Sequence, residues 1–198
     1  DVENQNVVVA FVKEGISDEE VTISLTMNNM EPIVGMEEPY YYRNKAQYPV
    51  GTNKDGHAVT GFYAGRTHSI IANTECYLGV PGNKEILEII LDYMEQNHVS
   101  AYDEETGKGC VRHILIRTSF TSGEVMVCLV INGKDKKLCK AKEYLPAQDI
   151  LLNRLAAVEG MTSVSVSINT ERTNVIMGKE IHVLWGEPTI SDVIHVRD

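Results

Sequence analysis

The stretch with the most suggestive chemistry is "PYYYRNKAQYPVG", residues 39–51. Proline and glycine at its ends predict an extended interior, and the side chains of a strand alternate between two faces. Arg43, Lys45 and Gln47 would therefore share one face. Two cations and an amide in a row suit a phosphate or a nucleic-acid base edge, since both offer hydrogen-bond acceptors. A strand face that only water touches would have the same composition, so the pattern alone leaves both interpretations open.

Other residue types that could support catalysis give weaker signals. The chain contains no GxGxxG fingerprint and no phosphate-binding P-loop. His68 precedes Cys76 by eight residues, but no acidic third member stands out, so an ordinary strand-end histidine is favoured over a catalytic Cys–His pair. His113 falls inside a predicted strand, where a hydrogen-bonded structural role is the usual one. Composition and spacing by themselves indicate a domain without a self-contained active site.

The composition is that of an ordinary globular protein, with 43% hydrophobic and 23% charged residues among 198. No apolar run approaches the roughly 20 residues that cross a bilayer, and no signal peptide opens the sequence, so we expect a cytoplasmic protein. The formal net charge of −10 argues against bulk electrostatic binding of nucleic acid, so any RNA contact would be local. The four cysteines form no CxxC pair and are expected to be free thiols, with Cys128 in the core.

Hydrophobic periodicity predicts an α+β domain with a largely antiparallel sheet, two main helices on one face and the order ββαββαβββ, in which ferredoxin-like elements are conceivable. The clearest helix lies within 81–98, where Asn83 is the expected N-cap and apolar residues recur at helical spacing. The run "VMVCLVIN" is typical of a central strand covered on both sides. The other predicted elements are strands at 42–50, 58–71, 111–120, 162–169, 173–178 and 180–186, a helix at 146–159, and an ambiguous segment at 1–21.

Five blocks of the sequence together resemble the central region of bacterial RNA (uracil-5-)-methyltransferases, above all those that modify 23S ribosomal RNA. The blocks, in family order, are "YYYRNKAQYPVG", "GFYAGRTHSII...EC", "VRHILIRTSFTSGEVMVCLVI", "MTSVSVSINTERTNVIMG" and "ISDVI". The resemblance implies one central domain over 1–198, with a lead-in at 1–30 and a core at 31–198. It also implies that a TRAM-type RNA-binding barrel and an S-adenosylmethionine-binding Rossmann-like domain belong to the whole enzyme and lie outside this sequence.

In the mechanism that the resemblance implies, a cysteine thiolate adds to C6 of a flipped-out uracil, C5 takes the methyl group of S-adenosylmethionine, and a base removes the C5 proton. The catalytic cysteine and base of the family match no residue here, so we expect this fragment alone to be inactive. The implied partner is ribosomal RNA in preference to tRNA, with neither DNA nor a membrane, and a monomer is expected.

The resemblance assigns roles to four residues. Arg43, Lys45 and Gln47 match the family positions that face RNA, and these are the residues that alternation already places on one face. Cys76 matches the fourth ligand of the 4Fe-4S cluster that many family members hold, whereas the other three ligands have no counterpart here. We therefore expect no cofactor in this fragment. The alternative that stays open is a free-standing α+β domain that binds RNA or protein without catalysis.

Overall fold

The computed structural model describes residues 35–67, 69–133 and 143–193. The chain divides into a leading unit, Asp1–Glu37, and one compact unit, Glu38–Asp198, to which everything below refers. The elements of this unit, in chain order, are β1 (Lys45–Thr52), β2 (Ala58–Tyr63), β3 (Ile70–Ala72), α1 (Asn83–Gln96), β4 (Val111–Thr118), β5 (Val125–Ile131), α2 (Gln148–Ala156), β6 (Met161–Ile168) and β7 (Glu180–Gly186).

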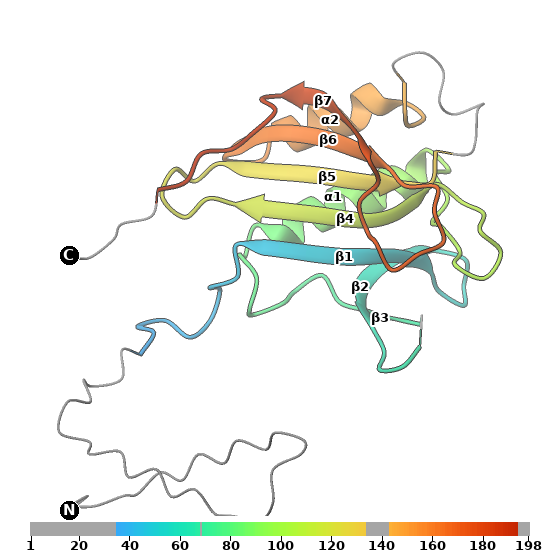
Figure 1. Ribbon diagram of the computed structural model, residues 1–198, viewed down its shortest axis with the longest axis horizontal. Helices are drawn as coiled ribbons and strands as arrows, with labels where there is room; N and C mark the ends of the chain where they lie inside the picture. The colour runs from blue at the N-terminus through green and yellow to red at the C-terminus, as the bar shows by residue number, and fades with distance from the viewer. Residues whose placement is uncertain (1–34, 68, 134–142, 194–198) are drawn as a thin grey trace, which may run out of the picture. The chain divides into compact units, whose positions relative to one another are not determined.

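The strands form one sheet in the order β3-β2-β1-β4-β5-β6-β7. Neighbouring strands are antiparallel except β5 and β6, which run parallel and are connected through α2. Both helices lie on one face of the sheet, behind it in Figure 1. The predicted class, an α+β fold with a mostly antiparallel sheet, is confirmed. None of the helices in the described residues is long and apolar enough to cross a membrane.

The main core lies between the helices and the sheet. The predicted stripe of α1 is buried there: Ile86, Leu87, Ile90, Tyr93 and Met94. The helix ends where His98 adopts a left-handed conformation (φ 54°) and the Val99 N–H donates to the Met94 carbonyl at 2.9 Å, which satisfies a carbonyl of the last turn.

Strand β5 is central and covered on both faces, as its continuous apolar sequence predicted. Val127 and Leu129 point into the main core, while Cys128 and Val130 join a smaller apolar cluster on the opposite face. The expectation that Cys128 is a core residue is therefore confirmed.

Several local predictions were wrong. Asn83 does not cap α1, because its side chain is buried and donates to the Tyr48 hydroxyl at 3.4 Å, while Gly82 takes the cap position. The strand predicted at 58–71 is divided into β2 and β3 by a turn. No strand forms at 173–178, which belongs to the loop between β6 and β7, and α2 begins two residues after Pro146. The ambiguous segment at 1–21 lies outside the described residues.

Candidate functional site

The face of the sheet turned away from the helices carries the candidate site, and we call it the open face. The strand registers arrange its residues in three rows that run across the strands. They are Lys45, Arg117, Met126, Ser163 and Gly186; then Gln47, Leu115, Cys128, Ser165 and Val183; then Pro49, His113, Val130, Ser167 and Ile181. None of these positions holds an acidic residue, although the chain has 28 of them.

The loop of residues 169–179, between β6 and β7, covers part of the open face. It crosses in front of the sheet in Figure 1. Ile176 and Met177 pack on Leu115, Cys128 and Val130 and so close the middle of the second and third rows. The first row has no such cover in this cluster, and its cations remain accessible.

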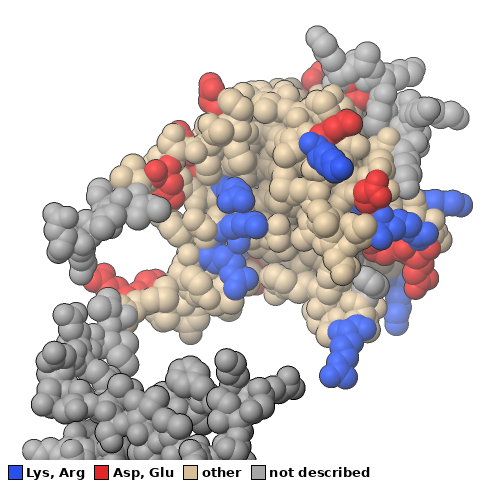
Figure 2. Space-filling view, in the orientation of Figure 1, with Lys and Arg blue, Asp and Glu red and all other residues tan. Residues whose placement is uncertain are grey.

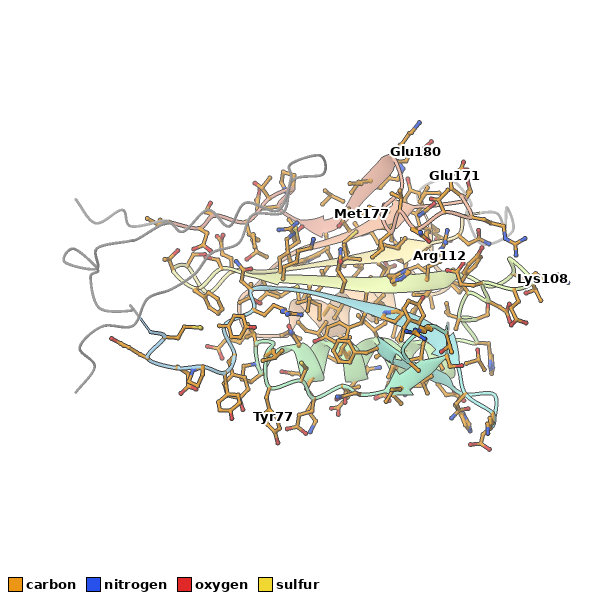
Figure 3. The ribbon with its side chains drawn as sticks, turned by 60° about the horizontal axis from the view of Figure 1, so that its bottom comes forward. Tyr77, Lys108, Arg112, Glu171, Met177 and Glu180 are labelled. Atoms are coloured by element: carbon orange, nitrogen blue, oxygen red, sulfur yellow. The ribbon has the colours of Figure 1, made fainter. Side chains whose placement is uncertain are left out.

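Arg112 and Asn169 anchor this loop. Nη1 of Arg112 donates to the carbonyls of Asn169 and Glu171, at 2.9 and 2.7 Å. The Asn169 amide donates to the carbonyls of Val175 and Ile176, at 2.7 and 2.9 Å. In Figure 3, Arg112 and Glu171 lie toward one end of the sheet and Tyr77 toward the other, so this anchor is remote from Tyr77.

The loop also borders a cavity of about 380 Å³ that is a poor candidate for an anion. Its lining includes Glu171, Lys179 and Glu180 as well as apolar residues. Two carboxylates against one ammonium repel a phosphate, so the cationic end of the sheet is the better candidate for a nucleic-acid contact.

At that end, Lys45 and Arg117 are opposite each other in the β1–β4 register, and both side chains are exposed. Figure 2 shows lysine and arginine gathered over the part of the sheet where β1 begins and β4 ends. Gln47 follows in the second row and is half-buried. The alternation of the strand thus places Lys45 and Gln47 on one face, as the sequence predicted.

Arg43 lies outside the regular strand, so alternation does not place its side chain. A bend at Asn44 separates it from β1, and its backbone forms an isolated parallel bridge with Gly79. The Arg43 N–H donates to the Leu78 carbonyl at 2.9 Å, and the side chain is exposed. Arg43 is therefore held next to the turn that carries Cys76, rather than in the row of Lys45 and Gln47.

The structure brings Arg43 and Cys76 close to the same buried residue, Tyr48. Burial raises the pKa of Tyr48, the hydrogen bond from Asn83 lowers it, and the electrostatic influences of Cys76 and Arg43 on it oppose each other. The thiol of Cys76 is free, and the residue is half-buried. Its backbone carbonyl accepts a hydrogen bond from the Gly79 N–H at 3.0 Å. Within the residues that the structure describes, no group of three or more His, Cys, Asp or Glu side chains could hold a metal.

Of the two histidines considered in the sequence, His113 lies in the described residues, on β4. His113 is 7% exposed, and burial, aided by the neighbouring Arg112 charge, lowers its pKa to about 4. It packs edge-on against Tyr63 and is neutral at physiological pH, as a structural histidine would be. His68, for which the sequence favoured an ordinary strand-end role over a catalytic pair with Cys76, lies outside the described residues.

Arg117 is the residue of this surface that the sequence did not single out. Its partner Lys45 lies far away along the chain, and only the β1–β4 register brings the two together. The alternation within 111–118 would have placed Arg117 on the same face as His113 and Leu115, but not beside Lys45.

Comparisons with known proteins connect this fold to RNA methylation. The chain is 39% identical over 185 residues to a Clostridium tetani protein named an uncharacterized RNA methyltransferase, covering 93% of this chain and 38% of that protein. A Clostridium acetobutylicum protein of the same description is 36% identical over 173 residues, covering 87% of this chain and 35% of that protein. No family model matches the chain.

One solved structure with a similar fold is the Pyrococcus abyssi tRNA (uracil-54, C5)-methyltransferase in complex with S-adenosyl-L-homocysteine. The TM-score is 0.58 at 19% identity, over 79% of this chain and 34% of that one. The sequence comparisons confirm the resemblance to bacterial RNA methyltransferases that the motifs indicated, and the solved structure shows that the fold is shared with an RNA (uracil-5-)-methyltransferase. It spans somewhat more than a third of the length of the curated relatives named above.

Proposed function

We propose that this chain is the central, RNA-contacting domain of an S-adenosylmethionine-dependent RNA (uracil-5-)-methyltransferase that acts on ribosomal RNA. The observation that carries the proposal is the open face, where exposed cations stand among neutral residues at one end of the sheet. The preference for ribosomal RNA rests on the sequence blocks shared with enzymes of that substrate class.

The residues have distinct roles in this proposal. Lys45 supplies a point charge for a backbone phosphate, and Gln47 supplies an amide that can donate to and accept from a base edge or a ribose hydroxyl. Arg43 supplies a second cation beside the Cys76 turn, where its guanidinium can form two parallel hydrogen bonds to a phosphate or a base. Together they hold the substrate strand while chemistry takes place on the part of the enzyme that binds the methyl donor.

S-Adenosylmethionine supplies the methyl group in this reaction, and its binding is assigned to a part of the enzyme outside this sequence. An iron–sulfur cluster does not fit the described residues alone, because a cubane cluster normally takes four cysteines. Cys76 is half-buried, and Cys110 and Cys128 lie in the two apolar clusters of the fold. Any cluster in the whole enzyme would draw its other ligands from elsewhere.

The proposal is tested in the whole enzyme with Arg43→Ala. We expect kcat/KM for methyl transfer to fall by something like tenfold to a hundredfold, about 1.4–2.8 kcal/mol of transition-state stabilisation. The melting temperature should be unchanged, because the side chain is exposed. Arg154→Ala is a matched control: Arg154 is a surface arginine on α2, behind the sheet, paired with Asp92 at 3.3 Å. That variant should retain full activity.

Unchanged activity in Arg43→Ala would mean that the Arg43 side chain contacts only solvent, and it would count against the proposal. A joint fall in activity and melting temperature would make Arg43 structural instead. Ribosomal RNA and tRNA are distinguished by supplying each as the only substrate and mapping the methylated uridine. Methylation of tRNA alone would overturn the assignment to ribosomal RNA.

A further inference from the structure

Lys45 and Arg117 carry like charges and lie directly opposite each other in the β1–β4 ladder. The Thr118 N–H donates to the Asn44 carbonyl at 2.9 Å, so residues 44 and 118 form a hydrogen-bonded pair of the antiparallel ladder. Such pairs alternate with pairs that are not hydrogen-bonded, whose Cα atoms are only about 4.5 Å apart and whose side chains are closest. Lys45 and Arg117, one step further along, form a pair of this closer kind.

No acidic residue of the described strands lies directly beside these two charges on the open face. Their neighbours across and along the strands are Gln47, Leu115 and Met126, all neutral. Neither cation forms an ion pair within the part of the chain that the structure describes. Like charges opposite each other destabilise a sheet, so this arrangement costs stability unless an anion sits between them.

We propose that Lys45 and Arg117 form a clamp that holds a single backbone phosphate of the RNA. The planar guanidinium of Arg117 can donate two parallel hydrogen bonds to the two non-bridging oxygens of the phosphodiester, and the ammonium of Lys45 can donate to one of the same oxygens. A phosphate bound between the two cations attracts both of them, and these two attractions offset the repulsion between the cations. The clamp rests on the proposed function, since it takes the polyanion to be the substrate RNA.

Exposed aromatic side chains near the clamp favour an RNA strand with unpaired bases over a free phosphate ion. Tyr42, 44% exposed, lies three residues before Lys45, and Phe120, 57% exposed, lies three residues after Arg117. Both therefore fall at the end of the sheet where β1 begins and β4 ends. Aromatic faces stack on unpaired bases, and cations beside them hold the backbone, which is how single-stranded nucleic acid is commonly bound.

The test is a double-mutant cycle in the full 198-residue chain, with a fluorescent single-stranded oligouridylate about ten nucleotides long as the probe. Binding is measured by anisotropy for wild type, Lys45→Ala, Arg117→Ala and the double variant, over a salt series that starts at low ionic strength. Each single variant should bind several-fold more weakly, and the double variant should lose less than the product of the two effects, because one phosphate serves both residues. The slope of log K against log salt should fall by about 0.7 in the double variant, the value for one phosphate on a single strand.

Lys54→Ala is the matched control, since Lys54 is an exposed lysine in the turn after β1, at the opposite end of that strand. This variant removes the same charge and should keep both affinity and slope. Melting of Arg117→Ala should occur at or above the wild-type temperature, because the change relieves a repulsion.

Additive losses with a slope change near 1.4 would mean two separate phosphates and would overturn the clamp. Equal effects of Lys54→Ala, or a lowered melting temperature in Arg117→Ala, would do the same. If inorganic phosphate binds as tightly as the oligonucleotide, the site is for a free anion and not for RNA. Complete lack of oligonucleotide binding by the wild-type chain at low salt would overturn the RNA contact itself. If the Lys45 and Arg117 variants bind the oligonucleotide normally while the activity of the whole enzyme still depends on Arg43, the clamp is refuted and the proposed function stands.

Discussion

The buried guanidinium of Arg112 allows a quantitative test of what holds the loop over the open face. Its side chain is 2% exposed and donates to two loop carbonyls, those of Asn169 and Glu171. A third hydrogen bond goes from Nη2 to Glu104 Oε1 at 3.3 Å. The guanidinium carbon also lies 4.3 Å from the centre of the Tyr102 ring, so the charge is placed against an aromatic face.

Arg112→Met keeps an unbranched apolar stem but is shorter than arginine, and it removes every donor together with the guanidinium that lies against Tyr102. Hydrogen bonds to charged groups contribute about 1.5–3 kcal/mol each, and loss of one partner of a buried ion pair costs about 3–5 kcal/mol. Two effects lower the net loss: the variant no longer buries a cation, and Glu104 is partly exposed, at 29%, so water can take the place of its partner. We expect the free energy of unfolding to fall by about 3 kcal/mol, which corresponds to a melting temperature about 6–12 °C lower.

The measurement is urea unfolding followed by circular dichroism, with Arg172→Met as a matched control. Arg172 also donates to two carbonyls, those of Glu104 and Glu105 at 2.8 and 2.7 Å, but in an exposed setting. Its replacement should cost less than about 1 kcal/mol, since water can satisfy the released carbonyls. Labelling of Cys128, resolved by mass spectrometry, should also become faster in Arg112→Met, because the loop that covers this thiol loses its anchor.

A loss in Arg112→Met within about 1 kcal/mol of that in Arg172→Met would refute this reasoning. It would mean that burying the cation costs as much as its hydrogen bonds contribute. An unchanged labelling rate for Cys128, combined with a large loss of stability, would show that Arg112 supports the domain globally and does not hold the loop in particular.

Two further predictions test the packing of the domain. The pKa of His113 lies below the ordinary value, so the unfolded chain binds the proton more tightly. Stability is then fully present above about pH 6.5 and is lost as the pH falls toward 4, by about 2 kcal/mol between pH 7 and pH 5. His113→Phe should remove that part of the pH dependence in urea titrations, and an unchanged dependence would contradict the prediction. Ile90→Ala opens a cavity under α1 and should lower the free energy of unfolding by about 2–5 kcal/mol. Ile150→Ala, at a position that is 48% exposed, is the control and should lower it by less than about 1 kcal/mol. Equal losses in the two variants would contradict the core position of Ile90.

The elements that the sequence predicted well are those set by local patterns. The apolar stripe of α1 repeats at helical spacing, and a helix with such a stripe has one way to bury it. The unbroken apolar run of β5 predicted a strand with two covered faces for the same reason. In both cases the pattern lies within a single element, so no knowledge of its neighbours is needed.

The predictions that failed depended on distant partners. The segment 173–178 alternates like a strand, but Asn169 binds two of its carbonyls and Met177 packs on the face of the sheet, so it forms a covering loop. Asn83 is a good cap in isolation, yet Tyr48 on another element takes its side chain. Arg117 became a candidate only once the β1–β4 register placed it opposite Lys45.

The four acidic residues of α1 weaken the proposed contact with RNA little, because of where they lie. The exposed acids of α1, Glu85, Glu88, Asp92 and Glu95, belong to the helix layer behind the sheet. A helix is about 10–12 Å across, so its outer side chains are more than one Debye length, about 8 Å at physiological salt, from the open face. Their repulsion is largely screened there, while a phosphate in contact with Lys45 and Arg117 is screened far less. The net charge of −10 should therefore slow the approach of RNA at low salt, whereas the affinity at physiological salt depends on the few cations of the open face.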